Sequence, residues 1–529
     1  MAMAPLQGCH SPSPTPTTAL PPLLPSSSSI SAFIASDPAL TLLHTRCASM
    51  AHLRQLHAAL VKSGLARDPI AASRAVAFCA GPCRDVAYAE RIVRHHPRPN
   101  SFMWNTVIRA LSDGARPEAA VALFVEMLGS PTPPERRTLP SVLAACARMG
   151  RAGAGAGAAL YGMALKLGLA GDSYVRNAAI AMYGSCGAAD EALALLAQCP
   201  EFDAVACNSA IVALARVGRV DEARAVFDGM PERTVATWSA MVSVYARAAR
   251  CGEALALFAA MQEGGVEPNA NVLVSVLGCC AGLGALEQGA WVHAYIDRHG
   301  VAMNTLVVTA LIDMYCKCGS VEKAREVFDM ARSQGLAKLS SWNSMMQGLA
   351  VHGQWQEAIA LFSELKSHGL SPDNVTFIAV LTAYGHSGMP DEAKAAFASM
   401  ANEHKVEPGI EHYGCLVDAL ARAGRLREAE GAIQAMPMAP DAAVWGALLS
   451  GCRLHGDADL GARAAREAVR CDPRDSGAYV LAASVAVRGG DAGRAAAAGV
   501  RGKMREAGVG KVPGCSMIEV NGVVHEFVS

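Results

Sequence analysis

The sequence is poor in aromatic and charged residues, and its cysteines form no tight pairs. Of its 529 residues only 5% are aromatic and 18% are charged, and the formal net charge is −1. This near-neutral charge argues against a protein that holds nucleic acid mainly by releasing counterions from phosphates. None of the 17 cysteines stands in a C-x-x-C pair, the knuckle that structural zinc sites normally use. Buried thiols in a reducing compartment explain these cysteines better than a metal does.

Catalytic motifs are missing as well. None of the 15 histidines is followed two residues later by glutamate, so the H-x-E signature of the zinc deaminases is absent. The glycine-rich run 150–157 has no lysine followed by serine or threonine, as a phosphate-binding loop requires, and is expected to be an expanded loop. We therefore predict no enzymatic activity, no metal and no cofactor.

The sequence also lacks a hydrophobic run long and pure enough to cross a membrane. The longest uncharged interior stretch, 268–286, is interrupted by proline, asparagine and serine, which makes a poor transmembrane span. The mean hydropathy of +0.23 is better explained by buried helices. We expect no membrane partner.

The first 36 residues contain no acidic residue, lysine or arginine, but many serines, threonines and prolines. Such a segment cannot form a core, and acid-poor, serine-rich leaders are typical of organellar transit peptides. Residues 1–34 are therefore expected to be a disordered leader for a plastid or a mitochondrion, with a plain disordered tail as the alternative. The absence of arginine favours the plastid.

What the sequence does contain is a repeat. Glutamates that open a helix-like segment recur at Glu191, Glu222 and Glu253, each 31 residues apart, and then every 34 to 36 residues as far as Glu428. One period, 235–269, carries two stripes of apolar residues at helical spacing, separated by Cys251-Gly252. Two short helices cannot bury both stripes alone, so neighbouring pairs must stack into an all-α solenoid.

These repeats open with an aromatic and a small polar residue, as in Trp104-Asn105 and Trp342-Asn343, and several close with Pro-Asn or Pro-Asp. With the segment LIDMYCKCGSVEKAREVFD (311–329), they resemble the plant pentatricopeptide repeat family, in its class that alternates standard, long and short repeats. The resemblance implies a right-handed superhelix of helix-turn-helix repeats over residues 35–441. The expected repeats are 35–68, 69–100, 101–135, 136–172, 173–203, 204–234, 235–269, 270–304, 305–338, 339–373, 374–409 and 410–441.

The pattern changes after residue 441. Residues 442–508 are similar to the E extension of that family, which consists of two degenerate tetratricopeptide-like units. Residues 509–529 form a tail in which alternating apolar residues around Asn521-Gly522 predict a small β-hairpin with a type I′ turn. This tail has Met517 where the family usually has tryptophan.

The resemblance also implies that each repeat faces one RNA base and recognises it through its fifth and last residues. Single-stranded bases leave their edges open to such short polar side chains, and an apolar second residue such as Phe102 or Val205 can sit between bases. Ser73 with Asn100 and Ser239 with Asn269 would favour adenine. Asn177 with Asp203 and Asn343 with Asp373 would favour uracil, and Asn208 with Thr234 a pyrimidine. Asn105 with Glu135, Thr309 with Lys338 and Gly414 with Asp441 should discriminate poorly, and the long repeats, with Pro140, Val274 and Ile378 at the fifth position, act as spacers.

Three functions remain open from the sequence. The first is recognition of sites for C-to-U editing in organellar RNA by a monomeric protein whose E extension recruits a deaminase carried by another protein. The second is stabilisation, processing or splicing of an organellar transcript. The third, from another class, is a protein-binding scaffold like a tetratricopeptide array, in which the fifth and last polar residues would be ordinary surface residues.

Overall fold

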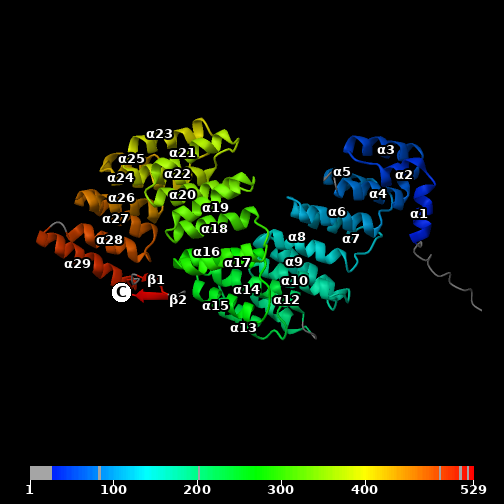
Figure 1. The fold of residues 1–529 in the computed structure, drawn as a ribbon. Coiled ribbons are helices and arrows are strands. Elements are labelled where there is room, and N and C mark those ends of the chain that lie inside the picture. The colour runs from blue at the N-terminus through cyan, green and yellow to red at the C-terminus, as the bar shows by residue number, and fades with distance from the viewer. Residues whose placement is uncertain are drawn as a thin grey trace, which may run out of the picture. The chain divides into compact units, whose positions relative to one another are not determined.

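The computed structural model describes residues 27–81, 85–199, 203–487, 490–511, 515–520 and 523–528. The chain divides by its internal contacts into an N-terminal unit, Met1–Val217, and a C-terminal unit, Gly218–Ser529. Each unit is a stack of helix pairs around its own apolar core (Figure 1). The predicted all-α repeat solenoid is confirmed at this level.

Every expected repeat contains two helices. The first helices are α2 (Pro38–Thr45), α4 (Pro69–Ala80), α6 (Ser101–Asp113), α8 (Thr138–Arg148), α10 (Ser173–Cys186), α12 (Ala204–Arg216), α14 (Val235–Arg247), α16 (Ala270–Leu283), α18 (Thr305–Lys317), α20 (Leu339–Val351), α22 (Asn374–Ser387) and α24 (Ile410–Arg422). The second helices are α3 (Met50–Lys62), α5 (Val86–His95), α7 (Pro117–Leu128), α9 (Ala154–Lys166), α11 (Ala189–Ala197), α13 (Val220–Asp228), α15 (Cys251–Glu263), α17 (Leu286–Arg298), α19 (Val321–Ser333), α21 (Trp355–Ser367), α23 (Pro390–Asn402) and α25 (Leu426–Gln434).

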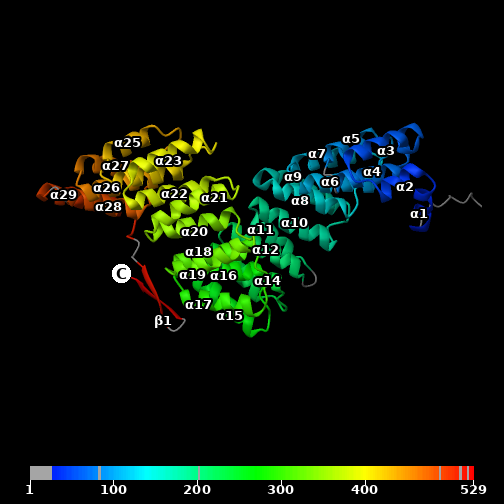
Figure 2. The ribbon, with the colours of Figure 1, turned by 45° about the horizontal axis from the view of Figure 1, so that its top comes forward.

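Within each unit, the first helix of a repeat packs against its own second helix and against the first helix of the next repeat. Helix α20, for example, contacts α21 and α22, and Figure 2 shows this stacking within the C-terminal unit. The first helices thus form one continuous layer in each unit. Within that layer, each residue of a first helix therefore lies beside the first helix of the next repeat.

The aromatic residue that opens several repeats belongs to the core. Trp342 packs edge-on against Phe328 of the preceding second helix, with ring centroids 5.0 Å apart, and Trp238 packs on Phe227 at the same distance. Edge-to-face pairs of this kind add to the stabilisation from burial. The tryptophan therefore fixes α14 and α20 to the preceding repeat, and the polar residue after it is held at a defined place.

The C-terminal unit continues with α26 (Ala442–His455), α27 (Ala458–Cys471), α28 (Ser476–Val487) and α29 (Gly490–Glu506). A two-stranded antiparallel sheet follows, in which β1 (Cys515–Val520) pairs with β2 (Val523–Val528). The turn expected at Asn521-Gly522 and the side chain of Met517 lie outside the described residues. The Glu519 carboxylate on β1 accepts hydrogen bonds from the backbone N–H of Glu287 (2.6 Å) and Gln288 (3.0 Å), so β1 reaches the N-terminus of α17 (Figure 2).

Two local expectations were wrong. Helix α1 (Ser27–Ala35) lies largely inside the leader expected to be disordered, because Phe33 packs on the core of the first repeats. Residues 1–26 lie outside the described part of the chain. The glycine-rich run 150–157 is not an expanded loop, since η2 (Gly150–Gly153) and the start of α9 occupy it, with the buried Gly157 against the Met182 side chain.

Candidate nucleic-acid interface

The polar residues expected to recognise bases lie on the layer of first helices. The fifth residue of a repeat sits one turn into its first helix, and the last residue precedes the first helix of the next repeat. Because consecutive first helices pack side by side, the fifth and last residues of one repeat face each other across the junction. The geometry therefore brings together side chains that are 26 to 30 residues apart in the sequence.

The two pairs predicted to favour uracil form direct hydrogen bonds. Asn343 Nδ2 donates to Asp373 Oδ1 at 3.0 Å, and Asn177 Nδ2 donates to Asp203 Oδ2 at 2.8 Å. In both pairs the amide carries a second N–H that can donate to a ligand, and the carboxylate supplies acceptors only. These junctions offer both a donor and acceptors in fixed positions.

One of the two pairs predicted to favour adenine is also joined. Asn100 Nδ2 donates to Ser73 Oγ at 3.2 Å, and Ser73 Oγ donates to the Pro69 carbonyl. Ser239 and Asn269 differ, since no hydrogen bond connects them in the described residues, although both belong to one repeat of the C-terminal unit. Asn269 Oδ1 instead accepts from the Val272 N–H at 3.0 Å.

The remaining candidates have other partners than those predicted. Asn105 Oδ1 accepts from Thr138 Oγ1 at 2.7 Å, and Thr309 Oγ1 lies 3.0 Å from Ser341 Oγ and 3.1 Å from Ser340 Oγ. Thr234 Oγ1 accepts from the Thr237 N–H at 3.3 Å. Asn208 lies on α12, in the other unit from Thr234.

Sequence reasoning missed a hydroxyl group at the third residue of the following repeat. Thr138, Ser341 and Thr376 are fully buried, and each contacts the fifth side chain of the preceding repeat. Thr376 Oγ1 donates to Asn343 Oδ1 at 2.7 Å, while the Asp373 N–H donates to Thr376 Oγ1 at 3.1 Å. The signal in the sequence was a serine or threonine three residues after the last residue of the preceding repeat.

The last residues also have a purely structural role. Asp68, Asn100, Asp203, Asn269 and Asp373 each accept a backbone N–H at the start of the next first helix. Asparagine, aspartate, serine and threonine are the preferred N-capping residues. Their recurrence at the last position is thus explained in part by helix capping, and only the atoms not used in the cap can contact a base.

Asp203 shows how one carboxylate serves both tasks. Its Oδ1 accepts from the Val205 and Ala206 N–H groups, and its Oδ2 accepts from Asn177. Burial acts to raise the pKa of Asp203, but the hydrogen bonds from Asn177, Ala206 and Val205 outweigh burial and lower the pKa. The side chain therefore stays charged, and an acceptor, throughout the neutral pH range.

A hollow of about 290 Å³ lies between two consecutive first helices, α10 and α12, in the N-terminal unit. Its wall includes Val205 and Asn208 on α12 and Gly184 on α10. The Oδ1 atom of Asn208 is buried without a hydrogen-bond partner, and so is the Oδ1 atom of Asn177 one repeat earlier. A buried acceptor without a partner costs about 1–3 kcal/mol, so both amides are suited to a ligand that brings a donor.

The apolar second residues of the first helices point into solvent. The exposed fractions are 53% for Phe102, 77% for Tyr174, 61% for Val205, 63% for Leu306 and 53% for Val375. Isolated exposed apolar residues are common on proteins. Here, however, all five stand at the second position of a repeat, and after all but Val375 a polar side chain follows three residues later, at the fifth position.

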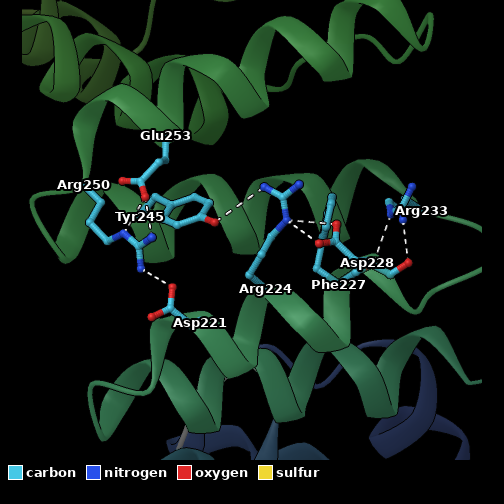
Figure 3. Close-up of polar contacts among 8 residues, drawn as sticks. All are labelled: Asp221, Arg224, Phe227, Asp228, Arg233, Tyr245, Arg250 and Glu253. Atoms are coloured by element: carbon cyan, nitrogen blue, oxygen red, sulfur yellow. Dashed lines mark hydrogen bonds and ion pairs between the residues drawn. The ribbon is translucent and has the colours of Figure 1, made fainter.

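Charged residues concentrate on the second helices instead, where they neutralise one another. Figure 3 shows Arg250, at the start of α15, bonded to Glu253 and to Asp221 of the previous second helix, the latter at 2.6 Å. In the same view Arg224 on α13 bonds Asp228 and donates to Tyr245 Oη at 3.5 Å, and Arg233 donates to the backbone carbonyls of Phe227 and Asp228. Similar pairs between successive second helices are Arg94–Glu126, Arg325–Glu357, Arg332–Glu364, Lys394–Glu428 and Arg425–Asp391.

The site contains no metal centre in the part of the chain that the structure describes, since no group of three or more histidine, cysteine or acidic side chains is placed to bind an ion. Nor is any described helix both long and apolar enough to span a bilayer. Eight described cysteines are buried: Cys79, Cys146, Cys186, Cys207, Cys279, Cys280, Cys316 and Cys452.

Burial should make these thiols unreactive, which alkylation can test. Burial raises the pKa of Cys280 and of Cys316 to about 12, so at pH 8 only about one in 10⁴ of either is thiolate. We expect iodoacetamide at pH 8 to modify the exposed Cys471 first, and Cys280 and Cys316 only after urea is added. Mass spectrometry of the alkylated peptides measures this, and early modification of Cys316 in the native protein would contradict its placement.

The fold and this junction define a class: tandem helix-pair repeat proteins with one polar junction per repeat. Family models described as PPR repeat match residues 102–130, 205–235, 236–266, 307–336, 375–403 and 411–439, and one described as PPR repeat family matches 338–386. The chain is 49% identical over 510 residues to the chloroplastic pentatricopeptide repeat-containing protein At2g42920 of Arabidopsis thaliana, covering 96% of this chain and 89% of that protein. It is 32% identical over 604 residues to the mitochondrial At2g22410 of the same plant, covering 94% and 87%.

The chain therefore belongs to the pentatricopeptide repeat family. It is a repeat protein and, in keeping with these relatives, a protein of the plastid or mitochondrion. Among solved structures, maize PPR10 is 18% identical with a TM-score of 0.46, covering 86% of this chain and 76% of that one. PPR10 has also been solved in complex with an 18-nt psaJ RNA element, with a TM-score of 0.42 and coverage of 92% and 88%.

Proposed function

We propose that the protein binds a specific single-stranded RNA in an organelle through the layer of first helices, and that it selects sites for C-to-U editing. The observation that carries RNA binding is the junction hollow between α10 and α12, where the buried Asn208 Oδ1 has no partner beside the exposed Val205. The apolar side chain suits the face of a base, and the amide suits its edge. A peptide-binding scaffold has no need for an exposed apolar second residue beside a polar fifth residue, the combination found in repeats 101–135, 173–203, 204–234 and 305–338.

The junction of repeat 173–203 is complementary to the edge of uracil. Uracil presents one N–H donor between two carbonyl acceptors. At the 173–203 junction the unpartnered Asn177 Oδ1 can accept the base N–H, while the second N–H of Asn177 Nδ2 can donate to a base carbonyl. An adenine would bring two groups of the wrong kind to these atoms. Neutral contacts of this type need no large positive charge, consistent with the net charge of −1.

The fixed orientation of Asn343 gives a direct test of this base recognition. Replacing Thr376 with valine removes the hydroxyl that donates to Asn343 Oδ1, so the amide is held by Asp373 alone and its donor and acceptor are less firmly placed. We expect Thr376→Val to reduce the preference for uracil over cytosine at the base facing repeat 339–373 by about tenfold, one well-placed hydrogen bond. Fluorescence anisotropy with two RNAs that differ at that base measures the ratio.

Thr376→Ser is the matched control, because it keeps the hydroxyl and its hydrogen bonds. Both variants should keep the helical circular dichroism spectrum. Equal uracil preference in Thr376→Val and the unmodified protein would show that the hydroxyl only supports the helix start.

Editing rests on the C-terminal region. The helix pairs α26–α27 and α28–α29 continue the stack after the last repeat, as expected for an E extension that recruits a deaminase carried by another protein. Transcript stabilisation, processing or splicing by the same RNA-binding face is the alternative function. We favour the plastid, because the leader lacks arginine.

Sequencing all plastid and mitochondrial RNA from plants that lack the protein separates these functions. Loss of C-to-U conversion at one or a few cytidines, next to bases that match the adenine and uracil assignments, is the result expected for an editing factor. Normal editing with altered transcript ends, abundance or splicing would establish the alternative. No change in either would favour the protein-binding scaffold.

A further inference from the structure

An open cavity of about 780 Å³ lies on the second-helix side of the first two repeats, between the C-terminal ends of α3 and α5 and the short helix η1 (Leu65–Arg67). Lys62, Arg67 and Arg91 bring positive charge to its wall, and no aspartate or glutamate lines it. All three cationic side chains are exposed. The cavity thus has one sign of charge, in a chain whose net charge is close to zero.

This lack of acidic partners sets the cavity apart from the other second helices. Elsewhere arginines of one second helix pair with carboxylates of a neighbouring second helix, as Arg250 does with Asp221. Among the described residues, Lys62, Arg67 and Arg91 form no ion pair. Acidic residues close to these cations in the sequence are engaged otherwise, since Asp68 caps α4, Asp85 pairs with Arg54 at 3.7 Å and Glu90 pairs with Arg94 at 2.9 Å.

His96 adds a hydrogen-bond donor that has no acceptor in the protein. It lines the cavity and is only 8% exposed. Its Nδ1 accepts the backbone N–H of Arg98 at 3.2 Å, so the neutral ring must carry its proton on Nε2. That Nε2 is buried and has no partner, a cost that an anionic acceptor would remove.

The cavity lies close in sequence to Asn100, which the proposed function assigns to base contact. Arg67 directly precedes Asp68, and His96 lies four residues before Asn100, the last residues of the first two repeats. Ser73 lies on α4, which begins just after η1, and Asn100 lies between the end of α5 and the start of α6. These two residues are hydrogen-bonded to each other. A polyanion that passes this junction therefore comes close to the cationic wall.

We propose that this cavity holds backbone phosphate of the RNA beside the base recognised by repeat 69–100. Arg67, Arg91 and Lys62 supply the positive charge, and His96 Nε2 supplies a neutral donor. The inference rests on the proposed RNA binding and adds to it a site on the second-helix side, away from the base-contacting layer. Phosphate contacts position a nucleic acid without specifying its sequence.

The salt dependence of binding tests this site. Each phosphate contact to a single strand contributes about −0.7 to the slope of log K against log salt concentration. We expect the double variant R67A/R91A to flatten the slope by about 0.7 to 1.4 between about 50 and 200 mM salt, and to weaken binding about tenfold. The probes are a labelled oligocytidylate, which matches none of the adenine or uracil pairs, and an RNA with the predicted bases.

The control variant R151A/K166A removes two exposed positive charges from α9 and its preceding turn, in the same unit. An unchanged slope in this control, with a flattened slope in R67A/R91A, supports the phosphate site. Equal flattening in both variants would show a diffuse charge effect and overturn it. If R67A/R91A keeps the full slope of log K against log salt concentration for RNA, the phosphate site is also overturned. Loss of binding to a polyglutamate peptide by the same variant would then show that the cavity takes an acidic peptide and not RNA.

The same data separate this inference from the proposed function. If the unmodified protein binds the predicted RNA no better than oligocytidylate, base recognition fails. A flattened slope in R67A/R91A would then still support the phosphate site. If the unmodified protein discriminates between the RNAs while R67A/R91A keeps the full slope, base recognition stands and the phosphate site falls.

Discussion

Replacing Trp342 with alanine is expected to destabilise the C-terminal unit by about 3–5 kcal/mol, the usual cost of truncating a buried aromatic residue. Trp342 is 1% exposed and packs edge-on against Phe328 and at a tilt against His368, with ring centroids 5.0 and 5.3 Å away. These contacts join α20 to the helices on both sides of it. The cavity left by alanine cannot close without moving one repeat toward the other.

Urea unfolding of the full chain, followed by circular dichroism, measures this change as a lower midpoint for the transition of the C-terminal unit. Val351→Ala is the matched control on the same helix, because Val351 is 55% exposed and its truncation should change stability by less than about 0.5 kcal/mol. If both variants unfold at the same urea concentration, Trp342 does not hold the repeats together.

Recoding one junction is expected to have the second large effect. The double variant N343S/D373N gives repeat 339–373 the serine and asparagine that repeat 69–100 has at Ser73 and Asn100. We expect the preferred base at that repeat to change from uracil to adenine. A pair of well-placed base-edge hydrogen bonds discriminates by about 1–3 kcal/mol, roughly 5- to 150-fold in affinity. Competition binding between two RNAs that differ at this base measures the change in their relative affinities.

Helix capping must be kept separate from base contact in this experiment. Asparagine at 373 still caps α22, because asparagine and aspartate cap almost equally well. Asn304→Asp is the matched control: Asn304 caps α18 and is the last residue of a long repeat with the apolar Val274 at its fifth position. A change of base preference in N304D as large as in N343S/D373N would show that the last residue acts through the helix start alone.

The repeat boundaries could be predicted because capping residues mark them. The first helices expected at 270 and 374 begin at Ala270 and Asn374, directly after Asn269 and Asp373, whose side chains cap them. The apolar spacing around Trp342 likewise placed this side chain in the core. Each of these signals is local and repeats along the chain, so an error in one repeat is corrected by the next.

Contacts between repeats could not be predicted in the same way. The bond from Thr376 to Asn343 spans 33 residues, and that from the Glu287 N–H to Glu519 spans 232. Thr309 shows the limit most clearly. Its register pairs it with Lys338, but its hydroxyl lies beside Ser340 and Ser341, because these serines stand in the first turn of α20. The repeat spacing determines which helices pack together. The local geometry at the start of the next helix determines which side chain contacts the fifth residue.

The central claim is that successive repeats recognise successive bases through their fifth and last residues. Selecting RNAs from a random pool with the purified full chain tests it most directly. With one base per repeat, the assignments for repeats 69–100 to 339–373 predict enriched RNAs containing A-n-n-U-Y-A-n-n-U in repeat order, where n is any base and Y a pyrimidine. Enrichment of that spacing, with the last U replaced by A when N343S/D373N is used, is the predicted result. Enriched RNAs without this spacing, or unchanged by N343S/D373N, would contradict the claim.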